Sequence, residues 1–333
     1  MKRRPALGCP AFRRLTQLNR RGLLKLGMLG ASGLSLGNLL AAEAQAAAAG
    51  ASTKTDRSVI ILWMRGGPSQ LETWDPKPNA PAEIRGEFGV IDTPVPGILL
   101  SEHLPLSAAL MKKWSILRSV HFRPEDGRNL GHSQGDQVCF TGYPPGPNAD
   151  VNVFPSCGSI VRRQLQELTP QMPAYVMVPR NVPGTESGYF GPSFAALETQ
   201  ADPASSSPFR VPNLAPQPDL SVDRLAERRN LLASIDRLGA RGIGDSQMRA
   251  GDAFHQRALD LPTGGTVQRA FDLDSEPQAV RERYGFYESF KSRVRAGGDA
   301  PNWPQRMLLA RRLVEAGVRV VTVDCRWWDT HGD

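Results

Sequence analysis

The residues most able to do chemistry lie at the end of the chain, in the run Asp329-Thr330-His331-Gly332-Asp333. A carboxylate and an imidazole two residues apart can chelate a divalent cation such as zinc, manganese or calcium. Asp329 and His331 are therefore candidate metal ligands. The alternative is a loop in which the aspartate caps a turn beside a surface histidine.

A second candidate group contains His121 and His132, two of the five histidines in the chain. His121 is a candidate metal ligand, although a lone histidine in a loop is more often structural. His132 lies in Gly131-His132-Ser133-Gln134-Gly135, which could also present Ser133 as a nucleophile. The spacing differs from the G-x-S-x-G turn of α/β-hydrolases, so Ser133 and His132 both stay candidate catalytic residues.

Asp75 is a third candidate, because it lies in a polar loop that follows Gly66-Gly67-Pro68. Its carboxylate could be a metal ligand or could stabilise a turn. The glycine pair lacks the lysine of a phosphate-binding loop, which favours a tight turn there.

The elements that would position these side chains alternate between strands and helices. Continuous apolar runs predict buried strands, and periodic apolar residues predict helices. The pattern predicts an α/β fold with a mostly parallel central sheet flanked by helices. The strands are expected at 58–63, 115–120, 174–178 and 318–323, and the helices at 104–113, 133–140, 156–168 and 305–316.

Polar residues follow three of these predicted strands. Arg65 comes after the first, His121 after the second, and Asp329 with His331 after the last. Parallel sheets form their functional crevice beyond the carboxyl ends of the strands. The sequence therefore predicts a site at that edge, within a domain over 47–333 that carries a mainly helical insertion at about 199–300.

The first 46 residues have the parts of a twin-arginine export signal. Arg20-Arg21 precedes a modest apolar run over 26–40, and Ala44-Gln45-Ala46 offers a cleavage site. The run is too rich in glycine for a spanning helix, which needs about 20 strongly apolar residues. We expect the twin-arginine export machinery as a partner, no stable membrane span after processing, and a location in the periplasm or cell envelope. An amphipathic terminal helix is the alternative.

The formal charge of +7 comes from this N-terminal segment. Residues 1–46 hold eight Lys or Arg and one acid, Glu43, which leaves 32 basic and 32 acidic residues in the remainder. A chain with no net charge has no basic field to attract a phosphate backbone. Nucleic acid is therefore not an expected partner.

Several motifs resemble the bacterial family called domain of unknown function 1501. They lie at 61–78, 117–121, 132–142 and 328–331. The family is often labelled sulfatase-like. The resemblance thus implies a fold related to alkaline phosphatases and sulfatases, and metal-dependent hydrolysis of phosphate or sulfate esters, with a sulfated or phosphorylated polysaccharide as partner.

The resemblance also locates departures from that chemistry. Sulfatases carry their nucleophile nine residues before a Thr-Gly pair, and Thr141-Gly142 puts His132 at that position. Met64-Arg65-Gly66 stands where those enzymes have a metal-binding aspartate. His132 would then be a nucleophile or a metal ligand. A non-catalytic envelope or polysaccharide-binding protein that keeps the fold is the alternative.

Family members are expected to continue past Asp333 with a further buried strand. The resemblance therefore implies a C-terminally truncated chain whose sheet lacks its last part and exposes an unpaired edge. Such a fragment is expected to be inactive.

Overall fold

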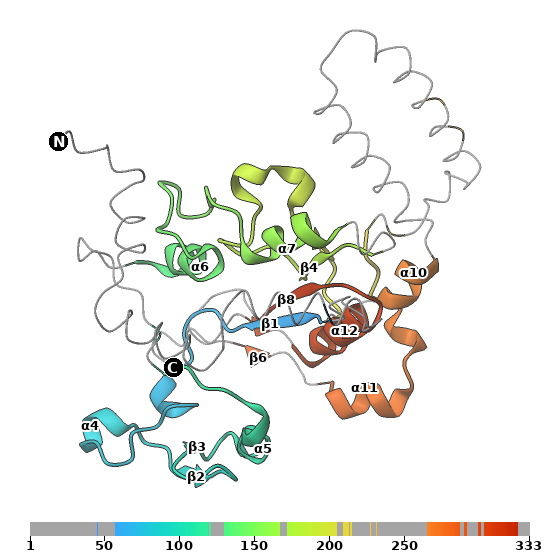
Figure 1. Cartoon of the computed structure of the whole chain (residues 1–333). Coiled ribbons are helices and arrows are strands. Elements are labelled where there is room, and N and C mark those ends of the chain that lie inside the picture. Colours follow the sequence, from blue (N-terminus) through green and yellow to red (C-terminus); the bar gives the residue numbers. More distant parts are fainter. Residues whose placement is uncertain are drawn as a thin grey trace, which may run out of the picture. The chain divides into compact units, whose positions relative to one another are not determined.

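The protein is described from a computed structural model (Figure 1). The structure describes residues 45, 57–118, 120, 130–166, 172–204, 209–212, 214, 227, 231, 265–286, 290–291, 299–300 and 303–325. The chain divides into two compact units at Arg57, and every strand and helix considered below belongs to residues 58–333. The predicted signal, except Gln45, and the candidate residues His121, Asp329 and His331 lie outside the described residues.

A parallel sheet forms the centre of the described structure. Its strand order is β1-β8-β4-β5, and each strand runs parallel to its neighbours. The predicted α/β fold with a parallel sheet flanked by helices is confirmed. The strand bounds are Val59–Trp63 (β1), Tyr175–Val178 (β4), Leu197–Glu198 (β5) and Val320–Asp324 (β8).

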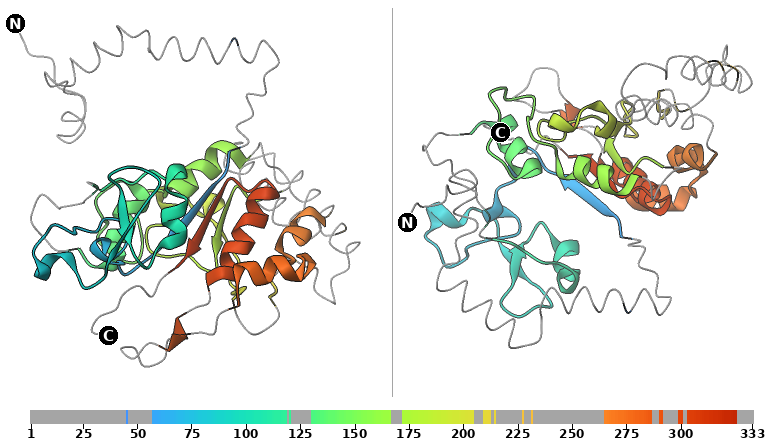
Figure 2. Two further views of the ribbon diagram at one scale, coloured as in Figure 1. Left: turned by 90° about the horizontal axis from the view of Figure 1, so that it is seen from below. Right: turned by 45° about the horizontal axis from the view of Figure 1, so that its top comes forward.

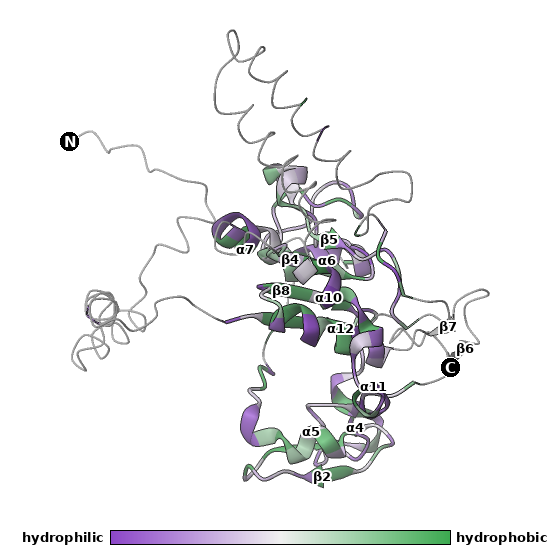
Figure 3. Ribbon diagram, turned by 90° about the vertical axis from the view of Figure 1, so that its right-hand side faces the viewer, coloured by the Kyte–Doolittle hydropathy of each residue, from purple (hydrophilic) through white to green (hydrophobic). Residues whose placement is uncertain are grey.

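Alternate residues of the central strands pack into two separate cores. Tyr175 and Met177 of β4 belong to one cluster, and Val176 and Val178 belong to the other. Successive side chains of a strand point to opposite faces of the sheet, so a strand that is apolar throughout needs cover on both faces. In Figure 3, β4 and β8 are drawn mainly in the hydrophobic colour.

One face of the sheet is covered by α12 and α10. Leu308, Leu309 and Leu313 of α12 are fully buried in the cluster that contains Val176 and Val178. Gly317, at φ +103, ends the helical segment before β8 begins. The helices are α10 (Gly265–Phe271), α11 (Gln278–Tyr284) and α12 (Trp303–Glu315), and α10 and α11 fall in the predicted helical insertion.

The other face is covered by α6 (His132–Thr141) and α7 (Cys157–Leu165), as Figures 1 and 2 show. Gly131 precedes α6, and its N–H donates to Gln134 Oε1 at 2.8 Å. Ser156 caps α7 by accepting from Ser159 N–H at 3.1 Å. Side-chain acceptors of this kind satisfy the first N–H groups of a helix.

A small third core lies in the segment between β1 and α6. Leu100, Ala108 and Met111 are buried there. The antiparallel pair β2–β3, the helix α5 and the short 3₁₀ helix that follows it supply these residues. The bounds are Ala82–Arg85 (α4), Val90–Asp92 (β2), Leu99–Ser101 (β3) and Pro105–Ala109 (α5).

The prediction of a strand at 115–120 is wrong for the residues of this range that the structure describes. Ser115, Ile116 and Leu117 adopt no strand conformation, and Leu117 is 79% exposed. Ile116 packs against the small third core instead of a sheet. An apolar run of this length can thus be used by a local cluster, and its pattern alone does not identify a strand partner.

Short elements complete the described structure. They are the antiparallel pair β6 (Phe290–Lys291) and β7 (Asp299–Ala300), and the 3₁₀ helices η1 (Gln70–Glu72), η2 (Met111–Lys113), η4 (Gly188–Phe190), η5 (Pro192–Phe194) and η6 (Leu273–Ser275).

β1 lies at an edge of the sheet. Among the described strands it pairs with β8 alone. Val59 is 53% exposed and Leu62 is 44% exposed, whereas every residue of β8 is buried. An apolar strand edge of this kind can accept a further strand.

Candidate functional site

The candidate site begins at the carboxyl end of β1, where Trp63 and Arg65 reach the helix α6. The indole Nε1 of Trp63 donates to Asp136 Oδ1 at 3.0 Å. The guanidinium Nε of Arg65 lies 2.6 Å from Asp136 Oδ2. The side chain of Asp136 is 4% exposed, so this buried carboxylate is held by one indole and one cation.

Ser133, one turn earlier in α6, is held by two charged partners. Its Oγ accepts a hydrogen bond from Arg65 Nη2 at 3.0 Å and donates one to Asp150 Oδ1 at 3.0 Å. Arg65 thus contacts both Ser133 and Asp136, which are three residues apart on one helix face. The hydroxyl of Ser133 is polarised by a carboxylate on the proton side and a cation on the lone-pair side.

Gln137 holds the loop that carries Asp150. Its side chain is buried, its Nε2 donates to the carbonyls of Asn148 and Ala149 at 2.8 Å, and its Oε1 accepts from Gly146 N–H at 2.9 Å. A buried amide with each of its groups paired restrains the backbone that it contacts. The position of Asp150 therefore depends on α6 itself.

Two close contacts fix α6 against the sheet. The rings of Trp63 and Phe140 have centroids 4.7 Å apart. At Gly184, with φ +90, an added Cβ would lie 2.6 Å from the carbonyl oxygen of Asp136. Only glycine permits this approach of the loop after β4 to the backbone of α6.

Burial raises the pKa of Asp136 above its ordinary value, although the charge of Arg65 and the hydrogen bond from Trp63 act in the opposite direction. The charge of His132 also lowers the pKa of Asp136, by a smaller amount. A buried carboxylate that has lost its water favours the proton-bound form.

We expect this raised pKa to make part of the folding free energy depend on pH. The folded state binds the proton of Asp136 more tightly than the unfolded state does, so the stabilisation from this group is full below the unfolded value of 3.8 and is lost as pH rises through the folded pKa. Urea unfolding from pH 3.5 upwards should show the wild type losing stability relative to Asp136→Asn. A difference between the two proteins that stays constant with pH would contradict the raised pKa.

Asp75 is in a different environment from the one that a metal ligand needs. Both of its carboxylate oxygens lie 2.7 Å from Lys77 Nζ, and Arg118 Nε lies 3.0 Å from Oδ1. Two cations at this distance repel a divalent ion from the same carboxylate. Asp75 in this arrangement therefore does not fit a metal site.

The structure describes three of the six predicted site residues. Ser133 and His132 lie together at the start of α6, and His132 is exposed. Among the described residues, no group of three or more His, Cys, Asp or Glu side chains is placed to hold a metal ion. Asp329, His331 and His121 lie outside the described residues, so their role as ligands stays a prediction.

The sequence analysis missed Asp136, Gln137 and Asp150. A signal for the first two was present, because residues at i+3 and i+4 from Ser133 share its face of the predicted helix. No local pattern could have identified Asp150, since its contact with Ser133 is made by the loop after the helix.

One of the comparisons with known proteins agrees with the family that the motifs resemble. Neither a curated protein nor a solved structure matches the chain. No helix in the described part of the chain has both the length and the apolar character for crossing a bilayer. The sequence model of one family, described as "Protein of unknown function (DUF1501)", matches residues 56–333. This chain, with Ser133 held between Arg65 and Asp150, belongs to that family.

Proposed function

We propose that this protein is an exported hydrolase of phosphate or sulfate esters, with Ser133 as its nucleophile. The proposal depends on one observation, the position of Ser133 Oγ between Arg65 Nη2 and Asp150 Oδ1, each at 3.0 Å. A nucleophilic hydroxyl needs a base to accept its proton and a positive charge to stabilise the oxygens of the ester. Both groups are already in contact with Ser133.

The expected reaction has two steps. Asp150 accepts the proton while Ser133 Oγ bonds to phosphorus or sulfur, and the ester bond to the alcohol breaks. His132, the exposed neighbour of Ser133, protonates the departing alcohol. In the second step His132 accepts a proton from water, and the water oxygen bonds to phosphorus or sulfur. The bond to Ser133 Oγ breaks, Oγ takes its proton back from Asp150, and phosphate or sulfate leaves.

Arg65 and the start of α6 supply the electrostatic part of this mechanism. The N–H groups of the first turn of a helix carry partial positive charge and bind phosphate or sulfate oxygens. Arg65 adds a full charge beside the same hydroxyl. Asp136 acts as a positioning residue, since it holds the Arg65 guanidinium through Nε.

A divalent ion of zinc, manganese or calcium, held by Asp329, His331 and His121, is part of the proposal. Asp75 is left out of this ligand set because Lys77 and Arg118 already neutralise it. Such an ion would withdraw charge from the ester oxygens. The export signal in residues 1–46, the periplasmic or envelope location and the sulfated or phosphorylated polysaccharide substrate belong to the same proposal.

We expect Ser133→Ala to reduce hydrolysis of p-nitrophenyl phosphate or p-nitrophenyl sulfate by about a hundredfold or more. The assay uses the chain without its first 46 residues, with zinc, manganese or calcium added in turn. Turnover by the wild type would contradict the inactivity that the family resemblance implies. Ser101→Ala is the matched control, because Ser101 is a buried serine outside this site. Equal rates for the wild type and Ser133→Ala would exclude Ser133 as nucleophile, and a loss seen in His132→Ala alone would assign that role to His132.

The second candidate is a non-catalytic envelope protein that keeps the fold. The neutralised carboxylate of Asp75 favours it, because one predicted metal ligand is committed to structure. This candidate predicts no turnover of either ester by the wild type under any of the three metals.

A further inference from the structure

A series of contacting aromatic rings lies beside the candidate site. We define the aromatic platform as Tyr143, Phe154, Tyr189, Phe190 and Phe194. Its rings contact one another in that order, with centroids separated by 4.1, 6.0, 5.1 and 5.8 Å. Rings in contact normally lie in a core, but Tyr143 is 52% exposed and Tyr189 is 67% exposed.

The platform is ordered by its own packing. Tyr143 stacks on Phe154 with an angle of 5° between the ring planes. One face of Tyr143 is covered by Phe154, and half of the residue is still exposed to solvent. At Gly188 an added Cβ would lie 2.4 Å from the carbonyl oxygen of Val153, and Tyr189 N–H donates to that same oxygen at 2.9 Å. The two segments that carry the rings are therefore joined through the backbone.

Ser133 and the first two rings of the platform are carried by the same helix and the loop that follows it. Tyr143 follows the end of α6, and Asp150, which accepts from Ser133, belongs to the same loop as Phe154. The helix rises about 12 Å between Ser133 and Thr141. A short oligosaccharide spans such a distance.

We propose that the aromatic platform binds sugar rings of a polysaccharide whose ester group reaches Ser133. This inference rests on the proposed function and names the surface that would hold the rest of the substrate. The C–H groups on the flat face of a sugar pack against an aromatic face, and the tyrosine hydroxyls can bond to sugar hydroxyls. Rings that are ordered before binding lose little conformational entropy when the ligand arrives.

Arg163 selects among sugars by charge. Its guanidinium carbon lies 4.5 Å from the ring centroid of Phe190 and 5.9 Å from that of Phe194. A cation over these rings attracts a sulfate or phosphate group on a neighbouring sugar. The surface therefore fits an anionic polysaccharide better than a neutral one.

Affinity electrophoresis of the chain without its first 46 residues tests the inference. The gels contain κ-carrageenan, sulfated fucan, phosphorylated mannan or, as the unsulfated relative of the first, agarose. We expect at least one anionic polysaccharide to retard the protein. The double variant Tyr143→Ala with Tyr189→Ala should raise the dissociation constant roughly tenfold or more.

Matched variants separate ring stacking from other effects. Phe286→Ala removes an aromatic ring that is 54% exposed outside the platform, and it should leave retardation unchanged. Tyr143→Phe keeps the ring and should retain most of the binding. Thermal melting followed by circular dichroism checks that each variant is folded.

The result separates this inference from the proposed hydrolysis. Ser101→Ala, a change outside both the candidate site and the platform, should bind the polysaccharide as the wild type does, because it leaves the rings in place. No retardation in any gel, or equal retardation of the double tyrosine variant, would overturn the platform even if esters are hydrolysed. If retardation depends on the two tyrosines but the protein hydrolyses neither ester, sugar binding by the platform is supported and the proposed hydrolysis is rejected.

Discussion

Gly158→Ala is expected to destabilise the folded protein by about 3 kcal/mol. Gly158 is the second residue of α7, and an added Cβ would lie 2.4 Å from Cζ of Tyr175 and within 2.6 Å of two further ring atoms. Alanine normally stabilises a helix relative to glycine by about 1 kcal/mol. The steric conflict should outweigh that gain.

The conflict cannot be relieved by a small movement. Tyr175 is a residue of the central strand β4 and is fully buried. Its hydroxyl contacts Met177 Sδ at 3.3 Å, and its ring belongs to the core under α6 and α7. Close-packed interiors transmit such a displacement to the neighbouring side chains. The helix α7 would have to move away from the sheet.

Gly135→Ala is the matched control, since Gly135 also lies inside a helix, α6, but has no atom within 4 Å of an added Cβ. It should stabilise the protein by up to about 1 kcal/mol. Urea unfolding of the two variants beside the wild type measures both effects. Equal changes in the two variants would show that Tyr175 does not pack on Gly158.

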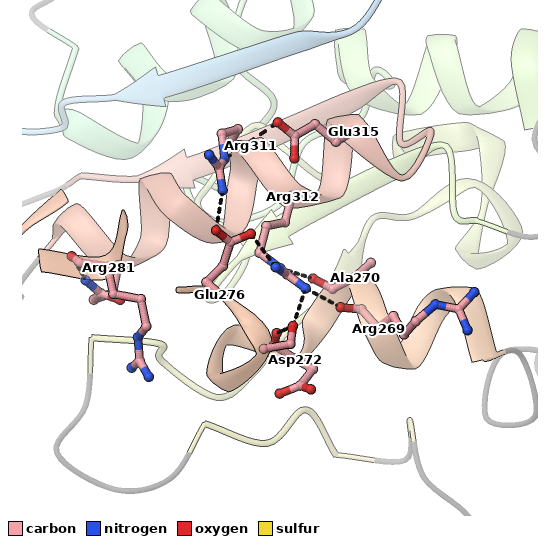
Figure 4. Close-up of polar contacts among 10 residues, drawn as sticks. Arg269, Ala270, Asp272, Glu276, Arg281, Arg311, Arg312 and Glu315 are labelled. Carbon is pink, nitrogen blue, oxygen red and sulfur yellow. Dashed lines mark hydrogen bonds and ion pairs between the residues drawn. The ribbon is translucent and has the colours of Figure 1, made fainter. Parts of the chain in front are cut away.

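Arg312→Ala is expected to cost about 3 kcal/mol of stability, because one guanidinium joins α12 to the chain between α10 and α11 (Figure 4). Arg312 forms an ion pair with Glu276 and donates to the carbonyls of Arg269 and Ala270 and to Ser275 Oγ. The last carbonyls of a helix have no partner within the helix, so the loss leaves the end of α10 unsatisfied. The side chains of Arg312 and Glu276 are only 13% and 12% exposed.

Arg281→Ala is the control for an exposed ion pair. Arg281 lies 2.9 Å from Asp274, whose side chain is 78% exposed. Water and salt screen such a pair, and its loss should cost less than about 1 kcal/mol. Arg312→Lys should recover only part of the loss, because an ammonium cannot reproduce the forked geometry of guanidinium. The denaturant guanidinium chloride is a salt and screens ion pairs, so stability is measured by thermal or urea unfolding instead.

The same network sets the protonation of Glu276. Burial alone would raise its pKa, but hydrogen bonds from Arg312 and Arg311 lower the pKa below its ordinary value. The carboxylate is therefore charged when both arginines are present. The contribution of this group to stability is present above the unfolded value of 4.5 and is lost as pH falls through the folded pKa.

The sequence alone determined the main elements of the fold. The apolar runs that form β4 and β8 are buried on both faces in a parallel sheet, and such runs have few other stable environments, whereas the run that forms β1 lies at the edge. The helices predicted at 133–140, 156–168 and 305–316 correspond to α6, α7 and α12. Residue type also identified Ser133, because a serine among glycines at a helix start is a recognisable pattern.

The tertiary structure decided how those elements meet. Val59–Trp63 pairs with Val320–Asp324 although about 260 residues separate them, and no periodicity in either run specifies that partner. The run at 115–120 looked like a strand but packs partly in a small local core. The exposed state of β1 also comes from strand order, since an apolar run carries no information about which neighbour it has.

The candidate site follows the same division. Local sequence identified Ser133, but its contacts with Arg65 and Asp150 join a strand end, a helix start and a loop. Asp75 is a possible metal ligand or turn residue by its sequence, and only the tertiary structure brings Arg118 to its carboxylate beside Lys77. Hydrophobic patterning is a property of neighbouring residues, so the sequence alone determined β1, β4 and β8 and the helices α6, α7 and α12. Pairing of charges depends on distance in space and on removal from water, so only the tertiary structure decided which polar residues meet.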